Sequence, residues 1–284
     1  MEDLLQNRND LLDWKREVLK PLTRPRRSGR HPSRRDVLKA AAVGAAALVG
    51  TPLLSGSSHA APAASPPGED KDGPKAVKTG TFFFPRMMFH VKDHTGDQWN
   101  IYPVGDVILR KRLKQLTNVN ASEDPIVVRL ADLDNTSRYP FVFATSEGYF
   151  DLPKIEEKNL KEFLMRGGFV YADDCVLGKT GDRFFQDYRK MIDKLFEKER
   201  MEMKRVPDDH EINHCYFRFP KGAPHLQGVD HGAYALFEKG TGRIMTYVTP
   251  GDLHCAWTRM WCGKAMSEAC LKMGVNIIIY YLTH

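Results

Sequence analysis

The greater part of this 284-residue sequence lacks an excess of charge of either sign. The whole chain carries a formal net charge of +6, from 42 Lys and Arg against 36 Asp and Glu. Residues 1–39 alone hold eleven basic and six acidic side chains, which leaves thirty-one basic and thirty acidic side chains beyond them. Because a folded part without a basic surface has little attraction for phosphates, we expect no nucleic-acid partner.

The sequence also lacks the paired cysteine spacings of structural zinc sites. No CxxC motif is present, so a metal site is not predicted. An odd number of cysteines leaves at least one thiol unpaired in an oxidising compartment. The five cysteines are Cys175, Cys215, Cys255, Cys262 and Cys270. We place Cys270 in the core, on the apolar face of a C-terminal helix, and the pattern around Cys262 indicates no role.

A weak alternative for metal binding is the run His210-x-x-x-His214-Cys215. In a helix, His210 and His214 would share one face. The local pattern favours an extended segment instead, which would separate the two imidazoles, so these three residues stay weak candidates.

No apolar run is long enough to predict a membrane span. The most apolar one, residues 40–54, is rich in Ala and Gly and is interrupted by Pro52. Before it, Ser33-Arg34-Arg35-Asp36-Val37-Leu38-Lys39 matches the twin-arginine export pattern, and small residues provide a cleavage site after Ala60. An Arg-rich linker before an Ala-rich helix is the alternative interpretation.

Export has consequences for location and partners. We expect the twin-arginine machinery to deliver the chain, already folded, to the periplasm or cell envelope. Contact with the membrane is expected only through the signal segment, which would anchor the protein if it is retained. An envelope protein partner is a further expectation.

Composition divides the chain into three parts. Residues 1–60 form an N-terminal extension with the export signal, and the Pro-, Ala- and charge-rich residues 61–79 form a flexible linker. Residues 80–284 show no comparable break, so we predict a single domain there.

Strand-like and helix-like segments alternate along that domain. This alternation predicts a mostly parallel α/β sheet with helices on both faces and a C-terminal hairpin. The strand-like segments are 81–91, 126–130, 141–145, 169–172, 233–237 and 243–249. The helix-like segments are 104–116, 153–166, 184–196 and 264–282.

Four sequence runs resemble a known family. They are GGFVYADDC from Gly167, DHEINHCYF from Asp209, GRIMTYVTPGDLHCAW from Gly242 and MGVNIIIYYLTH from Met273. Together they are similar to the bacterial domain-of-unknown-function family 4159, over nearly all of residues 80–284. The resemblance implies a flavodoxin-like, class I glutamine-amidotransferase-like fold and no particular activity.

The sequence departs from the family pattern at two places. Ser146-Glu147-Gly148 stands where the resemblance implies a His-Gly pair, and His210-Glu211-Ile212-Asn213 stands where it implies His-Pro-Ile-Phe. If those family positions bind a ligand, Glu147 and Asn213 put the same binding in doubt here.

Two clusters of reactive side chains follow predicted strands, where open α/β sheets bind ligands. Asp173, Asp174 and Cys175 form the first cluster. Because side chains alternate along a strand, the two aspartates should point to opposite faces, with Asp173 and Cys175 on the same side. The simplest interpretation is that one aspartate caps a helix starting near Thr180 or accepts hydrogen bonds from loop amides.

The second cluster is Asp252, His254 and Cys255, which could face the first. A glutaminase triad is not predicted, because the neighbours of Cys175 are too bulky for a nucleophile turn and no His and acid two residues apart follow near the end of the domain. The remaining catalytic candidates are Asp174 and Cys175, with His254 as base. The ligand-binding candidates are Asp173, Asp174, Glu147 and Asp252.

These observations favour an exported ligand- or protein-binding module of the envelope that takes part in assembly and lacks the glutaminase triad. The alternative is an envelope hydrolase that uses Asp174 or Cys175 with His254. A third hypothesis is a metal-dependent protein that folds before export. The sequence indicates no cofactor.

Overall fold

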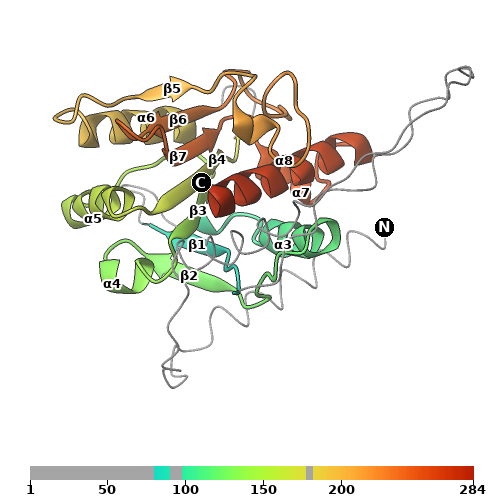
Figure 1. Cartoon of the computed structure of the whole chain (residues 1–284), viewed down its shortest axis with the longest axis horizontal. Helices are drawn as coiled ribbons and strands as arrows, with labels where there is room; N and C mark the ends of the chain where they lie inside the picture. The colour runs from blue at the N-terminus through green and yellow to red at the C-terminus, as the bar shows by residue number, and fades with distance from the viewer. Residues whose placement is uncertain (1–79, 90–97, 177–181) are drawn as a thin grey trace, which may run out of the picture.

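The computed structural model describes residues 80–89, 98–176 and 182–284 (Figure 1). The predicted export signal and linker, and the expected helix start near Thr180, lie outside these residues. The strands are β1 (Pro85–Met88), β2 (Ile126–Arg129), β3 (Phe141–Ser146), β4 (Phe169–Asp174), β5 (Met203–Arg205), β6 (Tyr234–Phe237) and β7 (Ile244–Thr249).

The helices lie between and after these strands. The α-helices are α3 (Val104–Leu116), α4 (Leu133–Thr136), α5 (Lys154–Met165), α6 (Arg183–Leu195), α7 (Leu253–Trp257) and α8 (Lys264–Thr283). Two short 3-10 helices are η2 (Gln98–Asn100) and η4 (Glu211–Asn213).

The strands of the described residues form one seven-stranded sheet in the order β2-β1-β3-β4-β7-β6-β5. The first five of these are parallel, whereas β6 runs antiparallel to both β7 and β5. The fold is therefore α/β with a mostly parallel sheet, as predicted, and the β6–β7 pair is the predicted hairpin. Taken in chain order, the parallel strands are arranged second, first, third, fourth and fifth, which is compatible with a flavodoxin-like fold.

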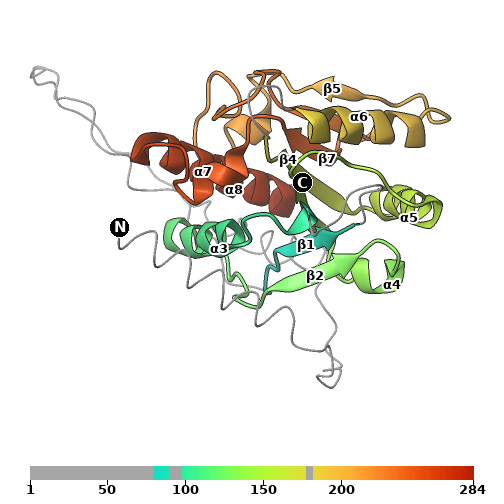
Figure 2. The ribbon, with the colours of Figure 1, turned by 180° about the vertical axis from the view of Figure 1, so that it is seen from behind.

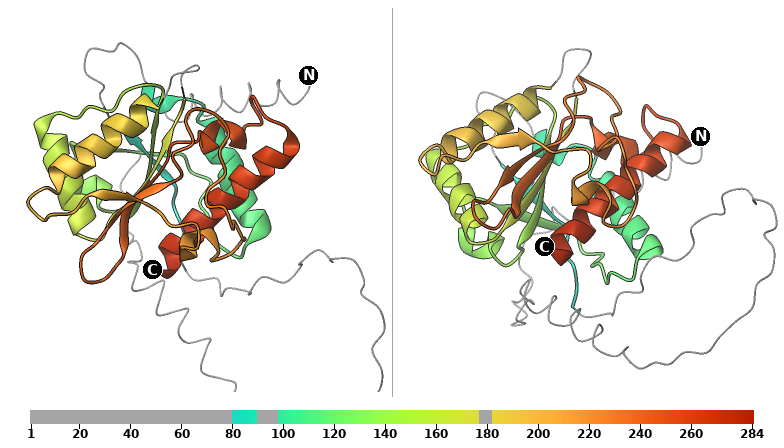
Figure 3. Two further views of the ribbon diagram at one scale, coloured as in Figure 1. Left: turned by 90° about the horizontal axis from the view of Figure 1, so that it is seen from above. Right: turned by 45° about the horizontal axis from the view of Figure 1, so that its top comes forward.

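Helices cover both faces of the sheet, so the central strands are buried on both sides (Figure 3). All six residues of β3, β4 and β7 are buried, as expected for parallel strands between two helical layers. One face packs against α3, α7 and α8, which lie together in Figure 2. The other face packs against α5 and α6.

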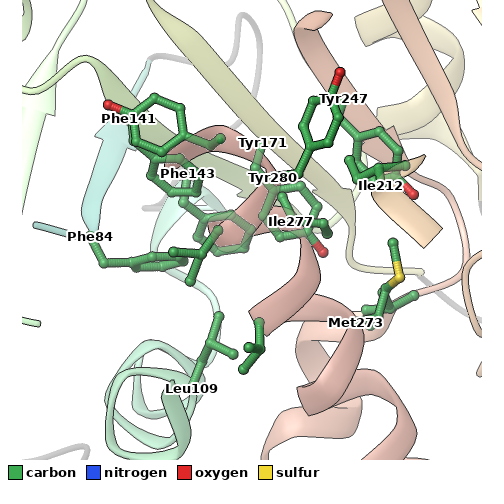
Figure 4. Close-up of a cluster of buried hydrophobic side chains, with 14 of the residues drawn as sticks. Phe84, Leu109, Phe141, Phe143, Tyr171, Ile212, Tyr247, Met273, Ile277 and Tyr280 are labelled. Atoms are coloured by element: carbon green, nitrogen blue, oxygen red, sulfur yellow. The ribbon is translucent and has the colours of Figure 1, made fainter. Parts of the chain in front are cut away.

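The apolar core beneath α3 and α8 is rich in aromatic side chains (Figure 4). Phe141 stacks on Phe169, with ring centroids 5.6 Å apart, and Tyr281 of α8 packs edge-on against Phe141 at 5.2 Å. Cys270 is fully buried in the same core, which confirms its predicted place. This core holds the helices that follow β1 and β7 firmly against the sheet.

Two elements differ from expectation. The segment around His210 forms the 3-10 helix η4 rather than an extended run, because the side chain of His210 accepts a hydrogen bond from the backbone of Ile212. Helix α7 was not predicted, because five residues after a sharp turn carry too little periodicity to reveal a helix.

Candidate functional site

The two aspartates at the end of β4 point to opposite faces of the sheet. Asp173 reaches the start of α7, whereas Asp174 reaches the start of α6. The alternation of side chains along the strand therefore persists to its last residue, and the two carboxyl groups do not converge. Cys175 lies on the α7 side, as expected for a residue that shares a side with Asp173.

Asp173 binds the turn that leads into α7. It accepts hydrogen bonds from the backbone N–H groups of Leu253 (3.2 Å) and His254 (2.9 Å), and from the hydroxyl of Thr249. Burial and the nearby Asp252 raise the pKa of Asp173, although these donors oppose the shift. The side chain thus satisfies the first amides of a helix, which is a structural role.

Asp174 performs the same role for the other layer. Its Oδ2 accepts a hydrogen bond of 2.9 Å from the backbone N–H of Phe185, in the first turn of α6. Burial raises the pKa of Asp174 to about 8, against the effect of that hydrogen bond. The carboxyl group is therefore largely protonated at neutral pH.

The two clusters that follow β4 and β7 meet at the carboxyl end of the sheet. Sγ of Cys175 lies 3.5 Å from Sγ of Cys255, and both thiols are free and buried. A carboxylate oxygen of Asp252 lies within 4.8 Å of both sulfur atoms. We call Cys175, Asp252 and Cys255 the thiol cluster. It is the one group among the described residues whose His, Cys and acidic ligand atoms lie close enough to hold a metal ion.

Asp252 occupies a strained position between β7 and α7. Its φ of 56° and ψ of 50° place it in the left-handed region, which costs a non-glycine residue free energy and is most often seen at turns and functional sites. The side chain of Gln227 donates a hydrogen bond to Oδ2, whereas Oδ1 is buried and has no hydrogen-bond partner among the described residues. Burial raises the pKa of Asp252, against the lowering effect of the Cys255 thiol, Gln227 and the backbone N–H groups of Cys255 and Val176.

The thiols of the cluster are not activated. Burial and the charges of Asp252 and Glu147 raise the pKa of Cys175, outweighing the lowering effect of its hydrogen bond with Cys255. The same hydrogen bond, together with burial, raises the pKa of Cys255 well above its ordinary value. Since the thiolate is the nucleophilic form of cysteine, both groups are weak nucleophiles at neutral pH.

Tyr102 and Glu147 border the thiol cluster. Burial and the charges of Cys255, Cys175, Glu147 and Asp252 all raise the pKa of Tyr102. Glu147 directly follows β3, and its side chain is partly exposed. These two partly exposed residues therefore lie close enough to the cluster to interact with it electrostatically.

His254 is directed away from the thiol cluster, toward β1 and α3. Its Nε2 lies 3.0 Å from Nη2 of Arg86 and 3.5 Å from Oδ1 of Asp106. Burial lowers the pKa of His254, so the ring is neutral at pH 7. We call Arg86, Asp106 and His254 the arginine network.

The guanidinium group of Arg86 is fully satisfied. It donates two hydrogen bonds to the carboxylate of Asp106, at 2.8 and 2.6 Å, and two more to the backbone carbonyls of Trp99 and Ile101. Burial alone would raise the pKa of Asp106, but the charge of Arg86 and the hydrogen bonds lower it to about 2. Arg86 and Asp106 thus form a buried ion pair with two hydrogen bonds, whereas Nδ1 of His254 beside them has no hydrogen-bond partner among the described residues.

Comparison with known proteins places the domain in a family. The model of the domain of unknown function DUF4159 matches residues 88–282, which is more than half of the chain. The chain belongs to the DUF4159 family. A twin-arginine signal sequence matches residues 31–50, so the protein is exported to the periplasm or envelope by that pathway. No curated protein matches the chain.

The DUF4159 domain contains no helix, among its described residues, with the length and apolar character needed to cross a bilayer. The three weak candidates for metal binding, His210, His214 and Cys215, do not point toward a common centre. His210 bonds the backbone of Ile212, the Nε2 of His214 lies 3.1 Å from the carbonyl of Asp208, and the thiol of Cys215 donates to the carbonyl of Asn276. Each side chain is instead engaged with backbone groups, which for Cys215 lie in α8.

Sequence reasoning missed two features of the DUF4159 domain. Arg86 and Asp106 are 20 residues apart and lie on different elements, so no local pattern pairs them. The sequence did offer one indication, an arginine within an apolar strand. Arginine is rarely buried in such a place unless it is paired with an acid. The link between Cys175 and Cys255 spans 80 residues, and only the placement of both after strands suggested it.

Proposed function

We propose that the exported domain is a ligand-binding module of the cell envelope, and that its ligand site is the carboxyl edge of the sheet around the thiol cluster. The observation that carries this proposal is Oδ1 of Asp252, a buried acidic oxygen without a hydrogen-bond partner. Buried polar atoms of this kind are rare in folded proteins and call for a missing partner. The edge is also where open α/β sheets place ligands.

The same geometry gives less support to a hydrolase. Asp173 and Asp174 use their oxygens to hold the first turns of α7 and α6. His254, the expected base, is engaged by Arg86, and the thiol of Cys175 carries a raised pKa. The nucleophile and base needed for covalent catalysis are therefore not in contact.

One observation favours the hydrolase as a second candidate. The pKa of about 8 makes Asp174 an acid that is protonated near neutral pH, which suits a proton donor. In this alternative, Asp174 donates a proton to a leaving group at the end of β4, with Cys175 or water as the attacking group and His254 as the base. The absence of a contact between His254 and either residue is the weakness of this candidate.

The two candidates can be separated with the exported protein purified from the envelope fraction. The measurements are the shift in melting temperature with a panel of short peptides, sugar phosphates and divalent metal salts, and the hydrolysis of chromogenic esters, amides and phosphoesters. For a binding module, we expect at least one ligand to raise the melting temperature. Asp252→Asn should abolish that shift, and Asp134→Asn, an exposed acid on α4, should leave it intact.

The outcome that would replace binding by catalysis is equally specific. It is turnover that disappears in Asp174→Asn or Cys175→Ser, while the melting temperature and any ligand-induced shift stay at the wild-type values.

A further inference from the structure

We propose that Cys175, Asp252 and Cys255 bind a thiophilic divalent metal ion, with Zn²⁺ as the best match. This inference deepens the proposed function and rests on it only in placing the ligand site at the carboxyl edge of the sheet.

The spacing of the ligand atoms fits a tetrahedral metal. With Zn–S distances near 2.3 Å, two thiolates of a tetrahedral site lie about 3.8 Å apart, and a carboxylate oxygen lies about 3.5 Å from each of them. In the protein the two sulfur atoms are 3.5 Å apart, and all three ligand atoms lie within 4.8 Å of one another. Small side-chain rotations therefore convert the cluster into a metal site.

A disulfide fits the same residues less well. The S–S bond is about 2.0 Å long, so the sulfur atoms would have to approach each other by about 1.5 Å. Cys175 follows the central strand β4 and Cys255 lies in α7, which Asp173 holds against that strand. A metal ion, by contrast, would be bound with the sulfur atoms at nearly the separation that the structure already has.

Asp252 offers the cluster a buried carboxyl group that the protein leaves partly unbound. The side chain is fully buried, and its Oδ1 has no hydrogen-bond partner among the described residues. Among the described residues, no Lys, Arg or His forms an ion pair with Asp252. A divalent ion would bind the deprotonated ligands, and each thiol would release one proton to solvent on binding.

The surroundings of Asp252 are those of an oriented ligand. Gln227 holds one carboxylate oxygen by a hydrogen bond, and the other is buried without a hydrogen-bond partner among the described residues. Groups of this kind fix the orientation of metal ligands and add to affinity.

Three protein ligands leave the fourth tetrahedral position open, as in zinc sites that bind substrates. Tyr102 and Glu147 are partly exposed polar residues near the cluster. The ion would thus offer its open position to an electron-pair donor such as a carboxylate or phosphate of an envelope ligand. Because thiols stay reduced in the cytoplasm, a domain that folds before export can receive the metal there.

The test uses the exported full protein, stripped of metal with a chelator under reducing conditions and titrated with CoCl₂. We expect one equivalent of Co²⁺ to produce the intense charge-transfer absorption of thiolate–cobalt bonds, and ZnCl₂ to displace it. Cys175→Ser and Cys255→Ser should each weaken binding by more than about 100-fold, and Gln227→Ala by about 10- to 100-fold.

A matched control is Cys262→Ser, because Cys262 is a partly exposed cysteine whose thiol makes only a weak contact, 3.9 Å, with the carbonyl of Ala256. This variant should bind Co²⁺ like the wild type. The melting temperature of each metal-free variant shows whether it is folded before its affinity is interpreted.

Three outcomes would overturn the metal site: no charge-transfer absorption with one equivalent of Co²⁺, absorption that persists in both Cys175→Ser and Cys255→Ser, or a Cys175–Cys255 disulfide in the freshly exported protein. If the peptides or sugar phosphates still raise the melting temperature in that case, the binding function stands without the metal. If Co²⁺ binds and turnover depends on Asp174, the metal site stands and the binding function falls.

Discussion

The arginine network and the thiol cluster lie on neighbouring elements, and both are buried at the carboxyl end of the sheet, yet they differ in charge balance. In the network, Arg86 satisfies Asp106 with two hydrogen bonds, and its remaining donors reach two backbone carbonyls and Nε2 of His254. In the cluster, Asp252 has an unpartnered oxygen and a like-charged neighbour in Asp173. The ion pair of the network holds α3 and α7 in place, whereas our proposal assigns the cluster a partner from outside the chain.

The largest expected effect comes from breaking the ion pair of the network. Arg86→Met leaves the buried carboxylate of Asp106 without its cation, which should lower the free energy of unfolding by about 3–5 kcal/mol. Arg112→Met is the control, because its pair with Glu268 is about one third exposed and should contribute less than about 1 kcal/mol. Urea denaturation measures both, and equal losses in the two variants would show that the network is not special.

Close packing around the network should produce the next effect. A methyl group at Gly105 would lie 2.8 Å from Nε2 and 2.9 Å from Cδ2 of His254, whose ring is buried and held by Arg86. We expect Gly105→Ala to cost up to about 3 kcal/mol of unfolding free energy, despite the better helix propensity of alanine. Gly263→Ala, with no atom within 4 Å of the added carbon, should be nearly neutral. A neutral Gly105→Ala would mean that the ring moves freely.

The network should also make stability depend on acid. Because the folded-state pKa of Asp106 is about 2, below its ordinary value of 3.8, the group contributes stability above about pH 4 and loses it as the pH falls toward 2. The loss should be about 2 kcal/mol. Denaturation at several pH values should show a smaller loss for Asp106→Asn, which starts from a lower stability. Parallel curves for the two proteins would contradict the pairing.

The smallest effect, and the one with opposite sign, should come from the thiol cluster. Asp252→Asn removes a buried like charge beside Asp173 and keeps a residue that tolerates the left-handed backbone. We expect the metal-free variant to gain about 1 kcal/mol of unfolding free energy while losing metal affinity. In contrast, Asp173→Asn should lower stability by about 1–3 kcal/mol, because an amide N–H₂ cannot accept from the backbone of His254. If both substitutions changed the unfolding free energy in the same direction, the contrast between Asp252 and Asp173 would be wrong.

Much of the fold follows from local sequence pattern. Helix α3 has the predicted bounds, Val104–Leu116, because its apolar period is regular and Pro103 precedes it. Strand β4 was predicted two residues short, because Asp173 and Asp174 do not resemble buried residues until their helix partners are known. Helix α7 is invisible in the sequence, since the turn at Asp252 depends on tertiary contacts.

The candidate site was predictable in its position but not in its pairing. Strand ends placed Cys175 and Asp252 at the same edge, because parallel strands end together. The contact between His254 and Arg86 was not predictable, because the two residues are 168 positions apart and no local sequence pattern links them. The contact depends on the order of the strands in the sheet, which places β1 directly beside β3.

The packing of α8 has a consequence for the timing of synthesis and export. The ring of Tyr281 contacts Phe82, Phe141 and Phe169, with centroids 6.3, 5.2 and 5.6 Å away, so a helix made late packs on strands made early. Until α8 emerges from the ribosome, the aromatic core on that face stays open to water. The domain can therefore finish folding only after translation of this segment, and a translocase that transports folded cargo must act after that moment.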